Sequence, residues 1–219
     1  MLNNSAMLRP RVIFVTDPLC SWCWAMLPEI LAVRAQLSGW AEFDLLMGGL
    51  QVGDRRPPAK AEVAMLQDLW QRVAESTGQK FLGRLPADPD FIYHSEVACR
   101  AVEAMRIHLK QPPWEFFEQL QHAFYLEARN LNSIEELARL AEPFGLEPAG
   151  LDSMLQSDQV VEKTRTAFGA AKELGALALP VVLLDTGEGP KLVSGGYVTA
   201  EFLVPDLSAR LDKASGVLH

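Results

Sequence analysis

The segment TDPLCSWCWAMLPEI most constrains the fold of this chain, because its two cysteines, Cys20 and Cys23, lie between two different hydrophobic patterns. Before them, residues 11–17 (RVIFVTD) form an almost uninterrupted apolar run, which is typical of a buried strand. After them, apolar residues recur at helical spacing until a Ser-Gly pair, which predicts a helix over residues 20–38. Residues 41–50 fit a second strand. The start of the chain therefore predicts a β-α-β unit with both cysteines at the strand-to-helix junction.

The remainder divides into a helical middle and a second mixed part. Residues 57–156 show only helical patterns, and their apolar stripes are most simply the core of a helical bundle rather than a cofactor site. After them the sequence predicts a helix, the strand LPVVLLD, a hairpin turn, the antiparallel strand KLVSGG and a final helix. We therefore expect an α/β domain formed by residues 1–56 and 157–219, interrupted by an all-helical insertion at 57–156.

The overall charge excludes one class of partner. The formal net charge is −8 and no basic run stands out, whereas a nucleic-acid-binding surface needs clustered Lys and Arg.

The first residues, MLNNSAMLRPR, are too short and too polar for the apolar part of a signal peptide, and no segment resembles a membrane span. We expect a cytoplasmic protein that binds neither nucleic acid nor membranes. In that reducing compartment a cysteine pair is expected to be catalytic or metal-binding.

Four functions of the cysteine pair can be compared. Attachment of a c-type haem needs His directly after the second cysteine, where Trp24 stands. A structural zinc site needs four ligands, and Cys99, the remaining cysteine, has no second cysteine beside it. Because Cys99 lies on an apolar helical stripe, we expect it to be buried and inert. A structural disulfide across so small a loop would constrain little of the unfolded chain. The redox function is therefore favoured, and no metal is expected.

The positions of the two sulfurs in the predicted helix suit different steps of a redox reaction. Residues i and i+3 of a helix lie on the same face, so Cys20 and Cys23 are close enough to form a disulfide and open it again. Cys20 would stand at the first position or cap of the helix, where unpaired N–H groups and the positive end of the dipole favour an anion. We therefore expect Cys20 to attack as a thiolate and Cys23, one turn deeper, to resolve the mixed disulfide.

On these residues the chain resembles the thioredoxin superfamily. Pro28 stands where that superfamily has the proline that kinks the active-site helix, although one helix could instead end near Ala25 and another begin at Pro28. The resemblance further implies that Leu179–Pro180, directly before an apolar strand, is a cis peptide bond. It also implies that the Leu179 backbone lies exposed beside Cys20, where it can pair with an extended substrate segment.

The helical insertion narrows the resemblance to DsbA-like proteins, and the local motif resembles their FrnE-like branch. The matching residues are Asp17, Cys20, Trp22 and Cys23, and later Gly195, Gly196 and Tyr197. Neighbouring branches, the hydroxychromene-carboxylate isomerases and kappa-class glutathione transferases, usually have serine as nucleophile, which Cys20 argues against. The dipeptide Ser21–Trp22 differs from the Pro–His of periplasmic DsbA, so a strongly oxidising potential is not implied.

Several residues around the cysteines have two possible roles each. Asp17 is expected to cap the helix rather than to modulate the charge of the cysteines. Ser21 is either a hydrogen-bond donor to the Cys20 thiolate or a surface residue. Trp22 is expected to form an apolar rim for substrate, whereas Trp24 is expected to be packing. Glu29 is either an exposed helix residue or a buried proton acceptor for Cys23.

Together these patterns predict a thioredoxin-like, DsbA-like α/β protein that is a thiol-disulfide oxidoreductase or isomerase. Its catalytic residues are expected to be Cys20 and Cys23, and its substrate-binding residues Ser21, Trp22, Leu179 and Pro180. We expect protein or peptide substrates that contain disulfides or thiols, and no cofactor beyond glutathione as a redox partner. Two alternatives stay open, a glutathione-dependent transferase or isomerase and a redox-gated, chaperone-like binding module. The sequence specifies neither the direction of the reaction nor the oligomeric state.

Overall fold

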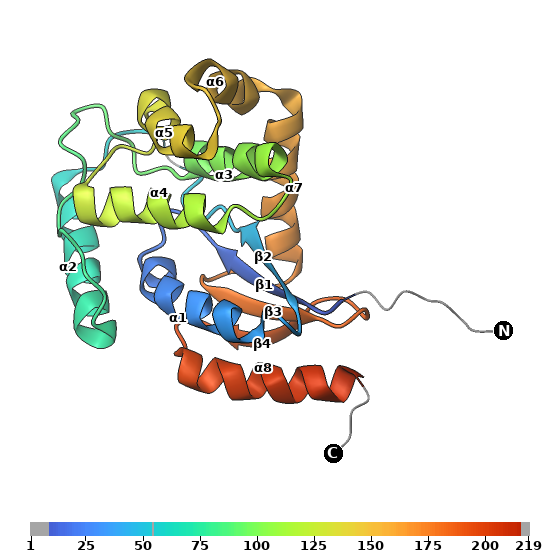
Figure 1. Cartoon of the computed structure of the whole chain (residues 1–219). Coiled ribbons are helices and arrows are strands. Elements are labelled where there is room, and N and C mark those ends of the chain that lie inside the picture. Colours follow the sequence, from blue (N-terminus) through green and yellow to red (C-terminus); the bar gives the residue numbers. More distant parts are fainter. Residues whose placement is uncertain (1–8, 54, 216–219) are drawn as a thin grey trace.

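A mixed sheet of four strands lies at the centre of the computed structural model, which describes residues 9–53 and 55–215 (Figure 1). In spatial order the strands are β2 (Glu42–Met47), β1 (Arg11–Thr16), β3 (Val181–Asp185) and β4 (Lys191–Gly195). β1 is parallel to β2 and antiparallel to β3, and β3 is antiparallel to β4. β1 has a neighbour on each side and is covered on both faces, and accordingly five of its six residues are buried, four of them apolar.

Within residues 9–53 and 55–215, eight α-helices and one 3-10 helix are distributed unevenly about this sheet (Figure 1). They are α1 (Ser21–Leu37), α2 (Lys60–Thr77), α3 (Glu96–Leu109), α4 (Trp114–Glu127), α5 (Ile134–Ala141), η1 (Glu142–Phe144), α6 (Pro148–Gln156), α7 (Asp158–Glu173) and α8 (Ala200–Ser215). α1 and α8 pack together on one face, while α7 contacts β2. α3, α4, α5 and α6 form a helical block beyond the sheet. The predicted thioredoxin-like fold with a large helical insertion is confirmed.

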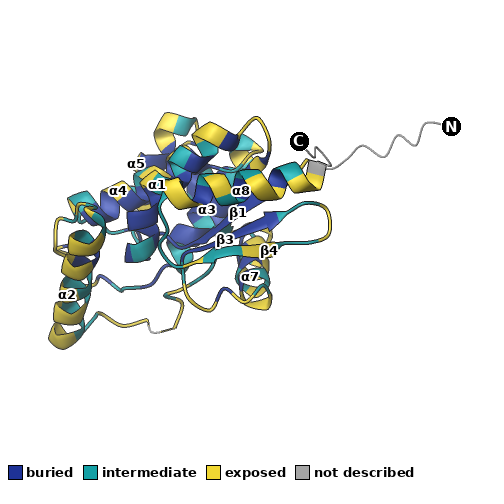
Figure 2. Ribbon diagram, turned by 90° about the horizontal axis from the view of Figure 1, so that it is seen from below, coloured by how far each residue is buried: buried dark blue, intermediate teal, exposed yellow. Residues whose placement is uncertain are grey.

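α7 contacts both parts of the predicted division of the chain. It packs against β2 in the α/β part and against α3 and α6 in the helical block. α2 differs from the other helices, because only Trp70 and Val73 of its residues are buried and the rest of its surface is exposed or half-buried (Figure 2). The boundaries at residues 57 and 157 stay a prediction. No helix among the described residues is both long enough and apolar enough to cross a membrane.

The two faces of β1 contribute to different parts of the core. Val12 and Phe14 belong to the large cluster that contains α1 and the helical block, whereas Ile13 and Val15 belong to a smaller cluster with α7. This alternation is the two-residue period of a strand. By the same period, the side chain of Thr16 belongs to the α1 face, where it is fully buried.

α1 begins immediately after Cys20 and continues through Pro28, which is exposed. The alternative of two helices separated near Ala25 is therefore wrong. A proline inside a helix lacks the N–H of one backbone hydrogen bond, and its exposed position leaves the buried face of α1 uninterrupted. That face carries Cys23 into the core, and Cys20 is buried just before it as the cap residue.

Candidate functional site

The Cys20 sulfur lies at the N-terminal cap of α1. Cys20 has extended backbone angles, and its Sγ accepts the N–H of Cys23 at 3.3 Å, as the cap oxygen of a serine would. The Cys20 thiol in turn donates to the carbonyl oxygen of Leu179 at 3.8 Å. The sulfur therefore has the free amides of a helix start on one side and a main-chain acceptor on the other.

Cys23 lies one turn deeper and is completely buried. Both thiols are free. Burial raises the pKa of the Cys23 thiol well above its ordinary value, and the adjacent Cys20 sulfur raises this pKa further. Cys20 is buried as well, with 3% of its surface exposed, so the pair differs in position: one sulfur lies at the cap and the second lies one turn deeper.

The Leu179–Pro180 segment faces the cysteines from the other side of the site. Its peptide bond is cis, and the Pro180 carbonyl accepts the N–H of Gly196 at 2.8 Å. The Leu179 side chain packs on Gly48, where an added Cβ would lie 2.6 Å from Leu179 Cδ1. Gly48 is itself attached to the end of β1, because its N–H donates to the Thr16 carbonyl at 2.7 Å. The end of β2 therefore supports the segment that faces Cys20.

The other residues of the cysteine loop differ in exposure. Trp22 is half-buried, with its ring 6.4 Å from that of Tyr197. Trp24 is buried as expected, because its Nε1 donates to the Lys80 carbonyl at 2.9 Å and its ring stacks on another aromatic side chain. Ser21 is also buried, so its interpretation as a surface residue is wrong. The described residues include no hydrogen bond between the Ser21 hydroxyl and Cys20, so that role stays a prediction.

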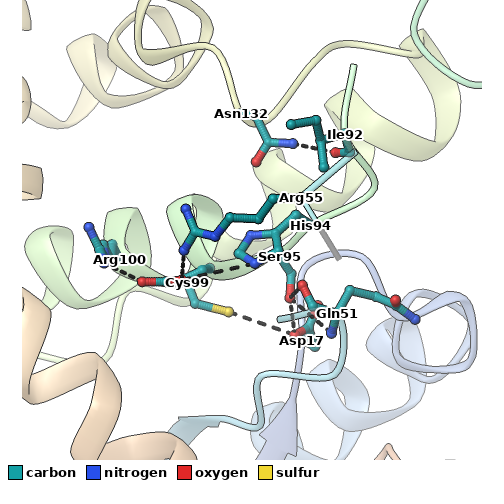
Figure 3. Close-up of polar contacts among 10 residues, drawn as sticks. Asp17, Gln51, Arg55, Ile92, His94, Ser95, Cys99, Arg100 and Asn132 are labelled. Atoms are coloured by element: carbon teal, nitrogen blue, oxygen red, sulfur yellow. Dashed lines mark hydrogen bonds and ion pairs between the residues drawn. The ribbon is translucent and has the colours of Figure 1, made fainter. Parts of the chain in front are cut away.

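Asp17 does not cap α1, and this expectation is wrong. Its carboxylate is completely buried, where Oδ1 accepts the N–H of Leu19 at 2.9 Å. Oδ2 accepts from the N–H of Leu50 at 2.8 Å. It also accepts from the Ser95 hydroxyl at 2.7 Å, a contact drawn in Figure 3. The Cys99 thiol approaches the same oxygen at 3.7 Å. Asp17 therefore connects the cysteine loop to the end of β2 and to the start of α3.

Burial determines the chemistry of this network. It raises the pKa of the Asp17 carboxyl, against the hydrogen bonds that lower it, and it raises the pKa of the Cys99 thiol well above the ordinary value. Cys99 is completely buried, as the sequence predicts. Among the described residues, no three His, Cys, Asp or Glu side chains come together as they would around a metal ion.

Glu29 has neither of its expected roles. Its Oε2 accepts the N–H of Ala200 at 2.7 Å, at the first residue of α8, and its Oε1 accepts from the Tyr197 hydroxyl at 3.4 Å. A carboxylate at this position satisfies a free amide of the helix start. Glu29 therefore connects α1 to α8. Its two oxygens bind Tyr197 and Ala200 instead of accepting a proton from Cys23.

Two tyrosines from the helical insertion complete the site and were not predicted. The Tyr93 hydroxyl donates to the Leu19 carbonyl at 2.7 Å, next to Cys20. Tyr125 stacks on Trp24 with ring centroids 5.8 Å apart. Burial raises the pKa of both tyrosines, and the nearby Cys20 sulfur raises it further. Tyr93 precedes α3 in a stretch without periodicity, so no sequence pattern pointed to it.

A cavity adjoins this side of the site. It has a volume of about 600 Å³ and lies between α2 and the segment that follows β2. Tyr93 lines it, together with Met65, Leu66, Leu69 and Arg72. The same tyrosine therefore borders the cavity and holds the carbonyl of the residue before Cys20.

Comparison with known proteins agrees with this geometry. The family model of the DSBA-like thioredoxin domain matches residues 11–203. The ClpXP adapter protein SpxH of Shouchella clausii is 20% identical over 185 residues, which are 83% of this chain and 60% of that protein. This chain thus spans less than two thirds of the length of that relative.

Two solved structures share nearly the whole fold. A proposed protein disulfide isomerase from Nitrosomonas europaea is 27% identical, with a TM-score of 0.85 over 94% of this chain and 99% of that chain. The cytosolic disulfide reductase DsbM from Pseudomonas aeruginosa, also solved with GSH, is 20% identical, with a TM-score of 0.76 over 93% of this chain and 99% of that chain.

Proposed function

Because this chain belongs to the family of DSBA-like thioredoxin domains, we propose that it is a thiol-disulfide oxidoreductase that acts through Cys20 and Cys23. The observation that supports this most strongly is the position of the Cys20 sulfur. It caps α1 and accepts the Cys23 N–H, while the Leu179 carbonyl faces it 3.8 Å away. A thiolate at this point would be stabilised by the free amides of the helix start.

The reaction follows from the order of the two sulfurs. The Cys20 thiolate attacks one sulfur of a substrate disulfide, which forms a mixed disulfide and releases the other substrate sulfur as a thiolate. Cys23 loses its proton and attacks the Cys20 sulfur, so that a Cys20–Cys23 disulfide forms and the second substrate sulfur leaves. Two electrons pass from the protein to the substrate. The reverse sequence oxidises a substrate dithiol.

The groups around Cys20 suit an extended peptide. The Leu179 carbonyl is a main-chain acceptor at the edge of the site, and main-chain pairing is a common way to bind an extended segment. Ser21 and Pro180 shape the site beside the sulfur. The half-buried Trp22, next to Tyr197, offers an apolar contact for side chains that flank the substrate cysteine. We propose disulfides of proteins or peptides as the substrate class.

The proposal includes a cytoplasmic location and the FrnE-like branch. In the cytoplasm glutathione would reduce the Cys20–Cys23 disulfide and so complete a reductive cycle. The similar P. aeruginosa protein is described as cytosolic and is solved with GSH.

The test is reduction of insulin disulfides with glutathione as reductant. Cys20→Ser is expected to abolish turnover, because an alkoxide cannot replace the thiolate in disulfide exchange. Cys99→Ser is the matched control, since it makes the same substitution at a buried cysteine that the reaction does not use. Equal turnover by Cys20→Ser and the wild type would refute the proposal. Glutathione-dependent isomerisation without either cysteine, or prevention of aggregation that survives Cys20→Ser, would support the alternatives instead.

A further inference from the structure

The hydroxyl of Thr16 is buried without a hydrogen-bond partner. Thr16 is the last residue of β1 and has no exposed surface. Its Oγ1 makes no hydrogen bond within the described part of the chain, although its main-chain carbonyl accepts the N–H of Gly48. Most buried hydroxyls in proteins are hydrogen-bonded, because burial of an unpaired one is unfavourable. An exception directly behind an active site needs an explanation.

The strand geometry places this hydroxyl on the face of β1 that packs in the same core cluster as Cys23. Val12 and Phe14 direct their side chains toward α1, and Thr16 is the next residue of that face. As a donor beside the sulfur, the Thr16 hydroxyl favours the thiolate over the thiol and so lowers the pKa of Cys23. The peptide N–H of Asp17 acts in the same direction. Both groups are donors, and both are positioned by the end of β1.

We propose that the Thr16 hydroxyl is a reserved hydrogen-bond donor for the Cys23 thiolate in the step that resolves the mixed disulfide. This inference rests on the proposed function and names a further residue for it. In the resting protein Cys23 is a thiol, a weak acceptor that gives the hydroxyl little to bind. When Cys23 becomes an anion, it becomes a strong acceptor and the hydroxyl is already in place.

The step balances without a proton from Thr16. Cys23 gives its proton to solvent, and its electron pair forms the bond to the Cys20 sulfur. The bond between Cys20 and the substrate sulfur breaks, and the substrate leaves with that electron pair and takes up a proton. Thr16 remains a neutral hydroxyl throughout, so its contribution is stabilisation of charge on the attacking sulfur.

The surroundings of Cys23 offer few other stabilising groups. The titratable groups near it are Cys20 on α1, Asp17 after β1, and Tyr93 and Tyr125 from the insertion. A thiol, a carboxyl group and a phenol cannot carry positive charge, and the Tyr93 hydroxyl already donates to the Leu19 carbonyl. The Thr16 hydroxyl and the Asp17 N–H lower the pKa of the Cys23 thiol, against the burial that raises it.

The test separates the two chemical steps in Thr16→Val, which keeps the branched shape and removes the hydroxyl, and in Thr16→Ser, which keeps the hydroxyl. A peptide disulfide with a fluorophore and quencher is mixed with reduced protein in stopped flow. The first phase, attack by Cys20, is expected to be unchanged in both variants. The second phase is expected to slow about tenfold in Thr16→Val, which is about 1.4 kcal/mol, and to recover in Thr16→Ser.

Thermal unfolding distinguishes this role from a structural one. Thr16→Val removes an unpaired buried hydroxyl, so its midpoint is expected to equal or exceed that of the wild type. An unchanged second phase in Thr16→Val would overturn the inference, as would slowing of both phases together with a lower midpoint. Turnover by Cys20→Ser would instead refute the proposed function. If turnover is lost in Cys20→Ser but both phases in Thr16→Val equal those of the wild type, this inference alone is refuted.

Discussion

Replacement of Gly48 by alanine should disturb the site without touching a cysteine. The new methyl group would lie 2.6 Å from Leu179 Cδ1 and 3.1 Å from Cδ2, whereas carbon atoms in contact are about 3.5–4.0 Å apart. Gly48 cannot withdraw freely, because its N–H is bound to the Thr16 carbonyl at 2.7 Å. The Leu179 side chain must therefore move by about 1 Å.

Two magnitudes follow from this displacement. The Leu179 side chain is half-buried and can rotate, so the free energy of unfolding should fall by only about 1 kcal/mol, the low end for an overpacked site. The part of the clash that rotation does not relieve shifts the Leu179 main chain, whose carbonyl lies 3.8 Å from the Cys20 sulfur, so the catalytic effect should be larger. A misplacement of about 1 Å in an active site costs up to about 100-fold, and we expect roughly tenfold in kcat/KM for insulin reduction.

Two further variants make this prediction specific. Gly169→Ala in α7 is the control, because an added Cβ there meets nothing within 4 Å, and both its activity and its stability should be retained. Leu179→Ala removes the atoms that clash, so Gly48→Ala should cost much less in that background than alone. Activity and stability of Gly48→Ala equal to those of Gly169→Ala would contradict a clash between Gly48 and Leu179. An equal cost of Gly48→Ala with and without Leu179→Ala would contradict it as well.

Two other substitutions test the polar contacts that support the site. Glu29→Ala should lower the free energy of unfolding by about 1 kcal/mol, because the amide at the start of α8 loses its acceptor, and loss of insulin reduction in the folded variant would contradict this role. Burial raises the pKa of Asp17 in the folded protein above its ordinary value of 3.8. Protonation of Asp17 therefore stabilises the folded state, and this stabilisation is lost as the pH rises through the pKa that Asp17 has in the folded protein. Denaturant unfolding of the wild type from pH 4 upward should therefore lose stability relative to Asp17→Asn, and a parallel pH dependence of the two proteins would contradict the raised pKa.

The fold could be predicted because its signals are local. The apolar run at 11–17, the helical spacing after the cysteines and the strand that begins after Pro180 each depend on neighbouring residues. The start of α5 depends on a local contact of the same kind, because the Ser133 hydroxyl accepts the N–H of Glu136 three residues later.

The site was predictable only in part, because some of its contacts join residues that are far apart in the sequence. The spacing of the two cysteines is visible in the sequence, and the role of the Leu179–Pro180 segment was expected from the resemblance to the thioredoxin superfamily. Asp17, by contrast, is held by Ser95, which lies 78 residues along the chain. The role of Tyr93 likewise depends on how the insertion folds over Leu19. Contacts of this kind are set by tertiary packing, and a single sequence contains no periodic signal for them.

Trapping of the mixed disulfide tests the order of the two sulfurs most directly. Cys23→Ser and Cys20→Ser are each mixed with a labelled peptide disulfide, and the adducts are mapped by mass spectrometry after proteolysis under non-reducing conditions. The cap position of Cys20 and the burial of Cys23 predict a stable adduct on Cys20 in Cys23→Ser and none on Cys23 in Cys20→Ser. An adduct that forms equally well on Cys23, or no adduct in either variant, would contradict attack by Cys20 and resolution by Cys23.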